Sequence, residues 1–366
     1  MQQSNATIFG IVTNMNNTSI GVGDMPTWVV NSTPLPPIPS KGLMDLPANA
    51  GTTGRLVDPN YQSPMSQQFN IGFSQQFGKE FVLESDFTHN LNIHENRTIQ
   101  LNYRIVNPDG SNPRILAAAF VAAGLGSNVL GAVNDTASVN RSGYDGFNIG
   151  VRKRLSHRLT FQTSYTLSRA RGYGGLSGEF GGSALDQTNY LAANDYVPTV
   201  RDERHRFVWS GVIDLPWGFQ ANPILQLASA RPYALTSGVD SNKDGTTNDN
   251  CVPGTVAPNG RTCPQGVTRN GQRGGYDLDG NWQSGRFFVL DLRVSKMFNL
   301  SKIREGMNLT FNFESFNLTN TTNFGRNFSG NVRATNYMST LGPATGTYGI
   351  EAAAPYQAQL SVRFSF

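Results

Sequence analysis

The segment richest in side chains that could do chemistry is residues 240–249, Asp-Ser-Asn-Lys-Asp-Gly-Thr-Thr-Asn-Asp. Its oxygen donors stand where the first half of a calcium loop has ligands, namely Asp240, Asn242, Asp244 and the carbonyl of Thr246. The twelfth position is Cys251 instead of a bidentate Glu, so Asp249 would have to supply the missing carboxylate. Calcium is therefore a candidate cofactor here, and the alternative is an Asx-rich turn without metal.

Two cysteines, Cys251 and Cys263, lie twelve positions apart in a segment rich in Gly, Pro, Asn and Asp. This spacing suits a disulfide within a loop of a protein from an oxidising compartment. A metal site would need more ligands, and none of the four histidines is near the pair in sequence. We therefore expect the disulfide.

Catalytic motifs are missing from the sequence. It has no Gly-x-Ser-x-Gly elbow, no His-Glu-x-x-His pair and no phosphate-binding Gly loop. The Gly-rich residues 172–182 are typical of a flexible loop instead. The net charge is only +4 and the 29 Lys and Arg are scattered, which argues against a nucleic-acid partner. We expect a protein that is not an enzyme.

The composition favours polar but uncharged surfaces. Charged residues make up 15% of the chain, against about 25% in typical soluble domains. No apolar window approaches the roughly 18 residues of a membrane-spanning helix; the longest run, residues 115–124, predicts a short helix inside a loop. Membrane-spanning strands need only about 9–11 residues, half of them polar, and stay compatible. The first residues lack the pattern of a signal peptide.

The chain ends in an uninterrupted alternation of polar and apolar residues over residues 356–366. One face carries the apolar set Ala358, Leu360, Val362, Phe364 and Phe366. A period of two predicts a β-strand with two unlike faces. By itself this segment is compatible with the closing strand of a membrane barrel and with the edge strand of a soluble sandwich.

The same alternation recurs in four hairpins, which with the last segment predict nine strands. The hairpins pair residues 68–77 with 81–88, 147–155 with 159–167, 207–214 with 219–227, and 288–298 with 307–314. Short turns alternate with long connections at about 89–143, 170–203, 230–286 and 317–356. Soluble folds seldom have such loops at every second connection, whereas outer-membrane barrels have short periplasmic turns and long extracellular loops.

Charged residues gather on the polar face of these strands, including Glu84, Asp86 and Asp214. The residues that we expect to line a water-filled lumen are Arg152, Arg154, Arg206, Asp291, Arg293, Glu314 and Arg363. On the apolar face Lys153 and Lys296 lie near the short turns, within reach of lipid headgroups. A soluble barrel with an apolar core predicts the same alternation. The loop pattern and the bulk of Phe, Leu and Trp on one face weigh against it and favour the membrane.

Three segments resemble a known family. Residues 58–71, the stretch Arg204-His-Arg-Phe-Val-Trp-Ser-Gly211 and the stretch Glu314-Ser-Phe-Asn-Leu-Thr-Asn-Thr-Thr-Asn-Phe324, followed by the Phe-x-Phe end, resemble Oar-like TonB-dependent outer-membrane receptors. The resemblance implies an all-β, antiparallel, up-and-down transmembrane barrel, in which residues 64–366 form about nine or ten of roughly 22 strands. Residues 1–63 are expected to be loop-rich, and residues 7–13 could form a strand.

The resemblance also implies a location in the bacterial outer membrane and energy-coupled uptake of a ligand. Its partners would be outer-membrane lipid, the barrel-insertion machinery that reads Leu360, Val362, Phe364 and Phe366, and an inner-membrane TonB motor acting through a plug. Because this chain shows neither plug nor signal peptide, we expect a C-terminal fragment. The alternatives are an adhesion or structural barrel without transport, and a soluble all-β binding protein.

Overall fold

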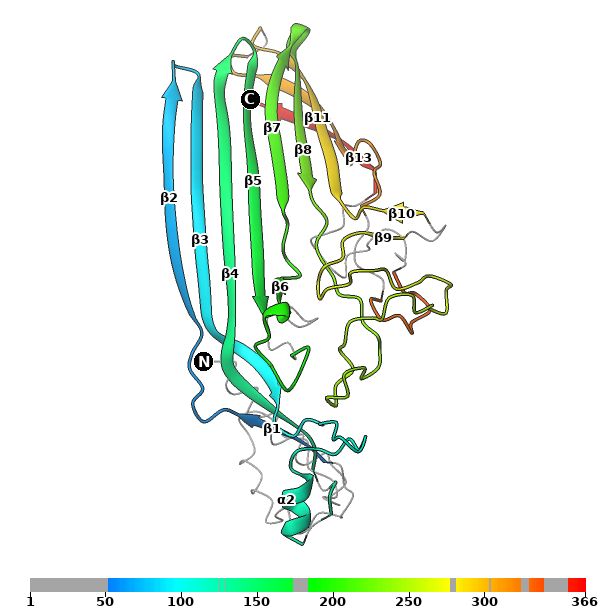
Figure 1. Ribbon diagram of the computed structural model, residues 1–366. Helices are drawn as coiled ribbons and strands as arrows, with labels where there is room; N and C mark the ends of the chain where they lie inside the picture. The colour runs from blue at the N-terminus through cyan, green and yellow to red at the C-terminus, as the bar shows by residue number, and fades with distance from the viewer. Residues whose placement is uncertain are drawn as a thin grey trace, which may run out of the picture.

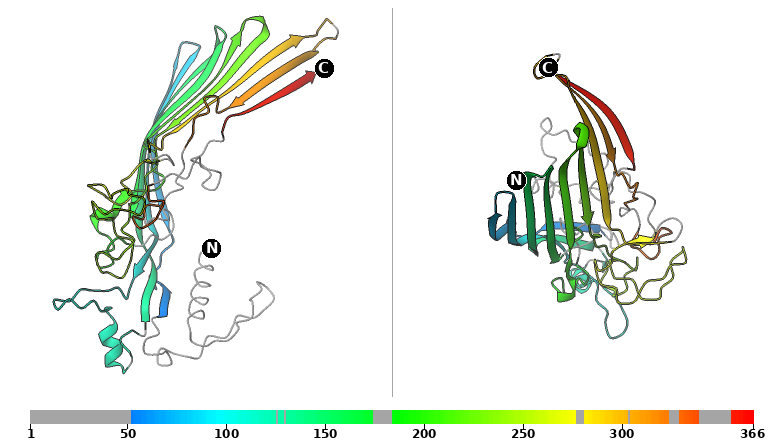
Figure 2. Two further views of the ribbon diagram at one scale, coloured as in Figure 1. Left: turned by 90° about the vertical axis from the view of Figure 1, so that its right-hand side faces the viewer. Right: turned by 90° about the horizontal axis from the view of Figure 1, so that it is seen from above.

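A single curved antiparallel sheet organises the chain (Figures 1 and 2). The computed structural model describes residues 52–124, 126–128, 130–173, 184–276, 281–302, 304–323, 329–338 and 355–366. Nine strands follow one another in the sheet in chain order, β2-β3-β4-β5-β7-β8-β11-β12-β13. The predicted fold class and the nine predicted strands are confirmed. The predicted strand at residues 7–13 lies outside the described residues.

The strands differ greatly in length. Their bounds are β2 Met65–Phe77, β3 Phe81–Gln100, β4 Leu130–Ser156, β5 Leu159–Tyr173, β7 His205–Leu215, β8 Phe219–Ala228, β11 Phe287–Asn299, β12 Asn308–Phe316 and β13 Gln357–Ser365. Two short strands join the sheet: β1, Thr52–Val57, pairs in parallel with β4, and β6, Tyr196–Pro198, pairs with β5. A separate ribbon is formed by β9, Gly275–Tyr276, and β10, Trp282–Gln283.

Short turns join the strands at one end of the sheet and long connections join them at the other. Gly78 and Gly218 adopt positive φ in two of the short turns, where a left-handed conformation favours glycine. The β7–β8 turn is the 3-10 helix η3, Pro216–Gly218, in which Trp217 also has a positive φ. The predicted helix is confirmed as α2, Ala117–Ala122, within the long connection between β3 and β4. Another 3-10 helix, η2, Ala193–Asp195, precedes β6.

The connection predicted at residues 89–143 was too long. Strands β3 and β4 stay paired far beyond the apolar alternation, out to Gln100 opposite Asn134, with register shifts near Glu95. Polar side chains occupy both faces of this extension, so the hydrophobic period disappears from the sequence while the backbone hydrogen bonds continue. The sequence pattern therefore marks only the part of each hairpin that has one apolar face.

The register keeps side chains of one kind together across neighbouring strands. Phe87 lies opposite Phe147, which in turn lies opposite Leu167. Among the described residues, neither side edge of this sheet has a partner strand, because the strand order ends at β2 and at β13. No helix within the described ranges is long and apolar enough to cross a membrane.

Candidate functional site: two unlike faces and a loop assembly

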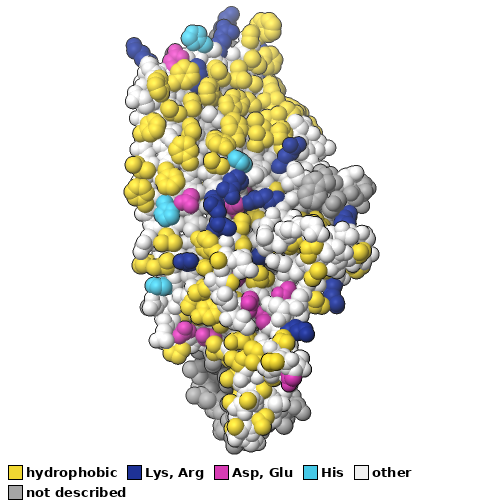
Figure 3. All heavy atoms as spheres, in the orientation of Figure 1, with side chains coloured by type: hydrophobic (Ala, Val, Ile, Leu, Met, Phe, Trp, Pro, Cys, Tyr) yellow, Lys and Arg dark blue, Asp and Glu magenta, His cyan; other side chains and the backbone are white. Residues whose placement is uncertain are grey.

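The convex face of the sheet carries an exposed apolar band. Its side chains include Phe73, which is 60% exposed, and Leu360, which is 82% exposed. Figure 3 shows the band as hydrophobic side chains covering the upper part of the sheet, on the side of the short turns. A contiguous exposed apolar surface of this extent marks a protein or membrane interface.

Lysine and aromatic side chains border the band on the short-turn side. The Lys296 ammonium donates to the carbonyl of Trp217 and lies 4.4 Å from the ring centre of Phe219. The Lys153 ammonium donates to the carbonyls of Ser156 and Leu159 at 2.9 and 3.0 Å. Both ammonium groups therefore bind backbone carbonyls at the short turns, which keeps their charge at the border of the apolar band.

The opposite border of the band is polar. Nδ1 of His89 lies 2.7 Å from Oδ1 of Asp145, and the Tyr165 hydroxyl lies 2.8 Å from Nδ1 of His205. Between this border and the turns, β3 runs from Phe81 to His89, which at about 3.3 Å per residue spans roughly 26 Å along the strand. That length suits a tilted membrane-spanning strand of about 9–11 residues.

The concave face is polar and hydrogen-bonded across the strands. The Asn148 amide donates to Asp86 at 3.2 Å and accepts from the Thr166 hydroxyl at 3.0 Å. Nε of Arg293 lies 3.5 Å from the Glu314 carboxylate, and its Nη2 donates to Asn312 at 3.0 Å. These hydrogen bonds between neighbouring strands therefore fix the positions of charged side chains. Such charges are costly without solvent, so this face is suited to contact with water.

Four of the seven residues predicted for a lumen wall meet around one hollow of about 550 Å³, namely Arg152, Asp291, Arg293 and Glu314. The other three share their face by register but lie outside the hollow. Arg206 stands opposite Thr166 and is paired with Glu203 at 3.1 Å, and Arg363 stands opposite Thr310. Arg154 donates its backbone N–H to the backbone carbonyl of Glu80 and lies near the short turn, at the end of this set of residues.

The long connections pack together below the band. We call residues 184–203, 230–274 and 329–338 the loop assembly. Gln187 donates its backbone N–H to Asp244 at 2.8 Å, which joins the first segment to the second. Val332 donates its backbone N–H to the carbonyl of Thr236 at 3.0 Å, which joins the second to the third.

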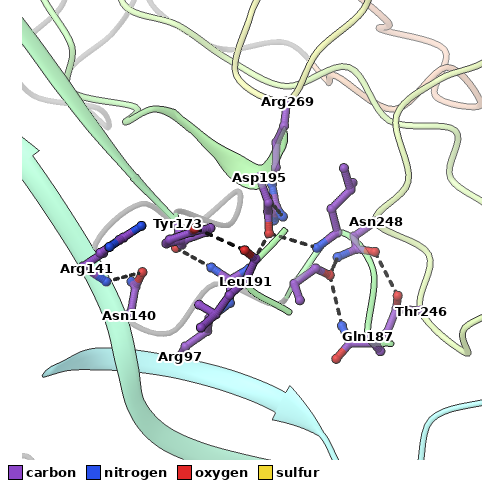
Figure 4. A network of polar contacts seen from close by, with 12 residues as sticks. Arg97, Asn140, Arg141, Tyr173, Gln187, Leu191, Asp195, Thr246, Asn248 and Arg269 are labelled. Atoms are coloured by element: carbon purple, nitrogen blue, oxygen red, sulfur yellow. Dashed lines mark hydrogen bonds and ion pairs between the residues drawn. The ribbon is translucent and has the colours of Figure 1, made fainter. Parts of the chain in front are cut away.

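A buried ion triad anchors this assembly to the sheet (Figure 4). Arg97 on β3 and Arg269 both contact the carboxylate of Asp195, and the Arg269 contact measures 2.6 Å. All three side chains are at most 3% exposed. Arg97 also donates to the carbonyl of Tyr173 at 2.8 Å. Burial lowers the pKa of Arg97, and the neighbouring Asp195 carboxylate opposes that shift.

Cys251 and Cys263 form a disulfide, with 6.1 Å between their Cα atoms. It lies in a buried apolar cluster with Leu235, Val332 and Tyr337. The Tyr337 hydroxyl is 3.6 Å from Sγ of Cys251, and burial raises the pKa of Tyr337 to about 12. The disulfide therefore joins the small apolar core of the loop assembly.

The candidate calcium loop is a hydrogen-bonded turn. Both carboxylate oxygens of Asp240 accept backbone N–H groups, from Asp244 and Gly245. Both oxygens of Asp244 are likewise acceptors, and one oxygen of Asp249 accepts from two backbone N–H groups. The described residues contain no cluster of three or more His, Cys, Asp or Glu arranged for a metal ion. The backbone donors that these carboxylates accept are those of an Asx-rich turn, and calcium stays a prediction.

A family model decides the identity of this two-faced sheet. The model for an outer membrane beta barrel domain matches residues 1–350. The chain belongs to this family. It is a barrel domain of the bacterial outer membrane, and the soluble alternative is set aside.

Solved structures similar to the barrel domain are described as transporters or import receptors. They include the outer membrane transporter YddB from Escherichia coli, at 9% identity and a TM-score of 0.45, covering 86% of this chain and 34% of that one. The FrpB iron transporter from Neisseria meningitidis has 10% identity and a TM-score of 0.42, with 87% and 34% covered. The ferric-catecholate import receptor Fiu from E. coli K12 also has 10% identity and a TM-score of 0.42, with 84% and 28% covered.

The barrel domain thus spans about a third of the length of these solved structures. No curated protein matches it. In outer-membrane barrels an apolar outer band faces lipid and a polar inner face lines the lumen; for the residues of this domain that assignment stays a prediction. Leu360, Val362, Phe364 and Phe366 belong to the exposed apolar band, and the rings of Phe364 and Phe366 are 5.8 Å apart.

No pattern in the sequence indicates the ion triad. Asp195 is 98 residues from Arg97 and 74 from Arg269, and all three residues come from segments that looked like loop or late strand. Only a signal that relates distant positions, such as paired changes among related sequences, could have revealed them.

Proposed function

We propose that the barrel domain forms part of the lumen wall and the extracellular mouth of a TonB-dependent, Oar-like transporter. The observation that carries the proposal is that the charged concave face of the sheet continues into the loop assembly. A charged concave wall around Arg152, Arg293 and Glu314 leads, on the long-connection side, toward loops fixed by buried ion pairs. A wall of this kind suits the passage of a polar ligand, and a fixed mouth suits its capture.

The loop assembly supports a role in ligand capture. Its ordering rests on the Asp195 triad, on Asp202 paired with Arg273, and on the disulfide. A preorganised mouth avoids the entropic cost of ordering loops when a ligand binds. The ligand would meet these loops first and the lumen wall afterwards.

The open edges support a wider barrel. Strands β2 and β13 each leave one edge without a partner strand in the described sheet, and an unpaired edge in a membrane is costly. We infer that further strands complete the barrel, up to the roughly 22 of TonB-dependent transporters. A plug contributed by the same whole protein would couple the lumen to the inner-membrane motor.

The last strand supports insertion by the barrel-insertion machinery. Four apolar side chains of residues 360–366 are exposed on one face of this strand. We infer that this face is read during assembly and then meets lipid.

Uptake measurements in cells test the transport proposal. The protein that contains this domain would be expressed in an outer-membrane host and offered a panel of radiolabelled ferric siderophores, cobalamin and maltooligosaccharides. We expect at least one probe to accumulate, and an uncoupler of the proton motive force to abolish its accumulation. Accumulation that survives the uncoupler, or surface display without uptake of any probe, would contradict the proposal; the second result favours an adhesion barrel.

A further inference from the structure

The loop assembly contains a hollow of about 540 Å³ beside its small apolar core. We call it the valine hollow, after Val252 and Val256, which line it. Residues of the connection after β8 and of the segment 329–338 form it together (Figure 1). Its base is apolar, because Ala257 and Val332 are almost fully buried and belong to the cluster around the disulfide. A concave site of roughly 300–1,000 Å³ has the size of a small-molecule pocket.

The two valines of this hollow are exposed to water. Val252 is 56% exposed and Val256 is 64% exposed, although Cys251 and Ala257, beside them in the sequence, are buried. Apolar side chains at the mouth of a concave site gain free energy when an apolar ligand covers them. The valine hollow is therefore suited to the apolar part of a ligand.

Backbone hydrogen bonds and the disulfide hold this part of the chain in place. Thr255 donates its N–H to the carbonyl of Val252 at 3.1 Å, which closes a tight turn between the two valines. Cys263 donates its N–H to the carbonyl of Thr255 at 2.8 Å and is bonded covalently to Cys251. The site is therefore formed before a ligand arrives, which lowers the entropic cost of binding.

A single charged side chain, that of Arg333, is found among the described residues that line the valine hollow. Arg333 is exposed, and its backbone N–H is fixed by a hydrogen bond of 2.9 Å to Oδ1 of Asn331. Among the described residues its guanidinium takes part in no ion pair. Because no carboxylate of the chain neutralises it there, this guanidinium favours a ligand that brings its own carboxylate.

We propose that the valine hollow binds a small amphipathic anion. The apolar body of the ligand covers Val252 and Val256, and its carboxylate accepts hydrogen bonds from Arg333. The hydroxyls of Ser241 and Thr255, which also line the hollow, are further donors for the carboxylate. The inference goes beyond the proposed transport function, because it concerns binding by the loop assembly and holds whether or not the protein transports its ligand.

Fluorine NMR titrations of the whole chain in amphipol test the proposal. The probes are para-trifluoromethylbenzoate and its neutral isostere para-trifluoromethylbenzamide. We expect saturable binding of the benzoate, about tenfold tighter than that of the benzamide, because only the benzoate offers a carboxylate to the guanidinium. Arg333→Gln should abolish this preference. Arg304→Gln, which removes an exposed arginine from the β11–β12 turn, is the matched control and should keep it.

Two further measurements test the apolar part of the site. The variant V252S/V256S should bind both probes about tenfold more weakly while still preferring the benzoate. An unchanged proteolysis pattern in each variant shows that the loop assembly is intact. Trifluoroacetate, which has the charge but no ring, should bind at least about tenfold more weakly than the benzoate.

Three results would overturn the proposal. The first is a wild-type protein that neither probe saturates, and the second is a preference for the benzoate that survives in R333Q. The third is trifluoroacetate binding as tight as that of the benzoate, because the hollow would then be a site for any small anion. These titrations involve no uptake, so their outcome is separate from that of the transport test.

Discussion

Arg97 and Asp195, 98 residues apart in sequence, form an ion pair in which both side chains are almost completely buried. Because Asp195 also binds Arg269, one carboxylate joins β3 to two long connections. A buried ion pair contributes little to stability when intact, but removing one partner leaves an uncompensated charge. The pair therefore serves mainly to fix which loops meet the sheet, and at what place.

Asp195→Ala should release the loop assembly from the sheet. The substitution leaves Arg97 and Arg269 buried without their carboxylate, and we expect a local loss of about 3–5 kcal/mol. Hydrogen exchange should rise in residues 184–203 and 262–273 while the strands in the apolar band stay protected. Glu305→Gln, in the exposed β11–β12 turn, is the control. Unchanged exchange in the Asp195 variant would show that the triad does not hold the loops.

Replacing both cysteines by serine should loosen the same assembly from its other side. The disulfide closes a loop of twelve residues, so its removal should cost about 2–3 kcal/mol of local stability. We expect faster protease cleavage between residues 237 and 267, measured by mass spectrometry of the fragments. Cleavage at the wild-type rate would mean that the apolar cluster around Leu235 and Tyr337 holds this loop without the covalent bond.

Asp249 should make the stability of its loop depend on pH. Burial raises the pKa of Asp249 above its usual 3.8, with smaller upward contributions from Asp244 and Asp240, while backbone N–H groups oppose the shift. The folded loop therefore binds more protons than the unfolded one between the two pKa values, and its stability falls as pH rises through that window. Asp249→Asn keeps an oxygen acceptor and should remove this dependence. Hydrogen exchange of residues 237–251 from pH 4 to 7 measures it, and a slope shared by both proteins would refute the assignment.

Calcium should not change the rate at which this turn is proteolysed if the hydrogen bonds of Asp240 and Asp244 alone hold its conformation. If the calcium interpretation is right, millimolar calcium should instead protect residues 240–249 from proteolysis, because extracellular modules bind it at about 10⁻⁴–10⁻³ M. The variant D240N/D244N should abolish that protection, and magnesium should not reproduce it. Protection that is identical with calcium, magnesium and chelator would exclude the metal site.

Leu360 and Gln359 are adjacent residues on opposite faces of β13, which allows a matched test of the two faces. An arginine at residue 360 would enter lipid and should destabilise the inserted barrel by up to about 2–4 kcal/mol, depending on its depth. An arginine at residue 359 would face the lumen wall next to Glu314 and should be tolerated. Urea titration of protein folded in vesicles measures both. Equal losses would contradict the assignment of the faces.

The sequence alone determined the segments of this protein in which polar and apolar residues alternate. Its alternation located all nine strands of the sheet order and separated the apolar residues of β13 from Gln359 and Arg363 on the other face. Its longest apolar run located the short helix. These features follow from neighbouring residues, because the two faces of a strand repeat every second position. The alternation alone therefore assigns residues such as Arg152 and Glu314 to a common face.

Only the tertiary structure decided what lies beyond the apolar band. The extension of β3 and β4, the parallel pairing of β1, the Asp195 triad and the stacking of Arg141 on Tyr173 left no periodic trace. In that region polar residues occupy every side, so the choice of partners depends on long-range geometry and not on local hydrophobicity. The loops could be predicted as loops, but not as an assembly built around a buried carboxylate.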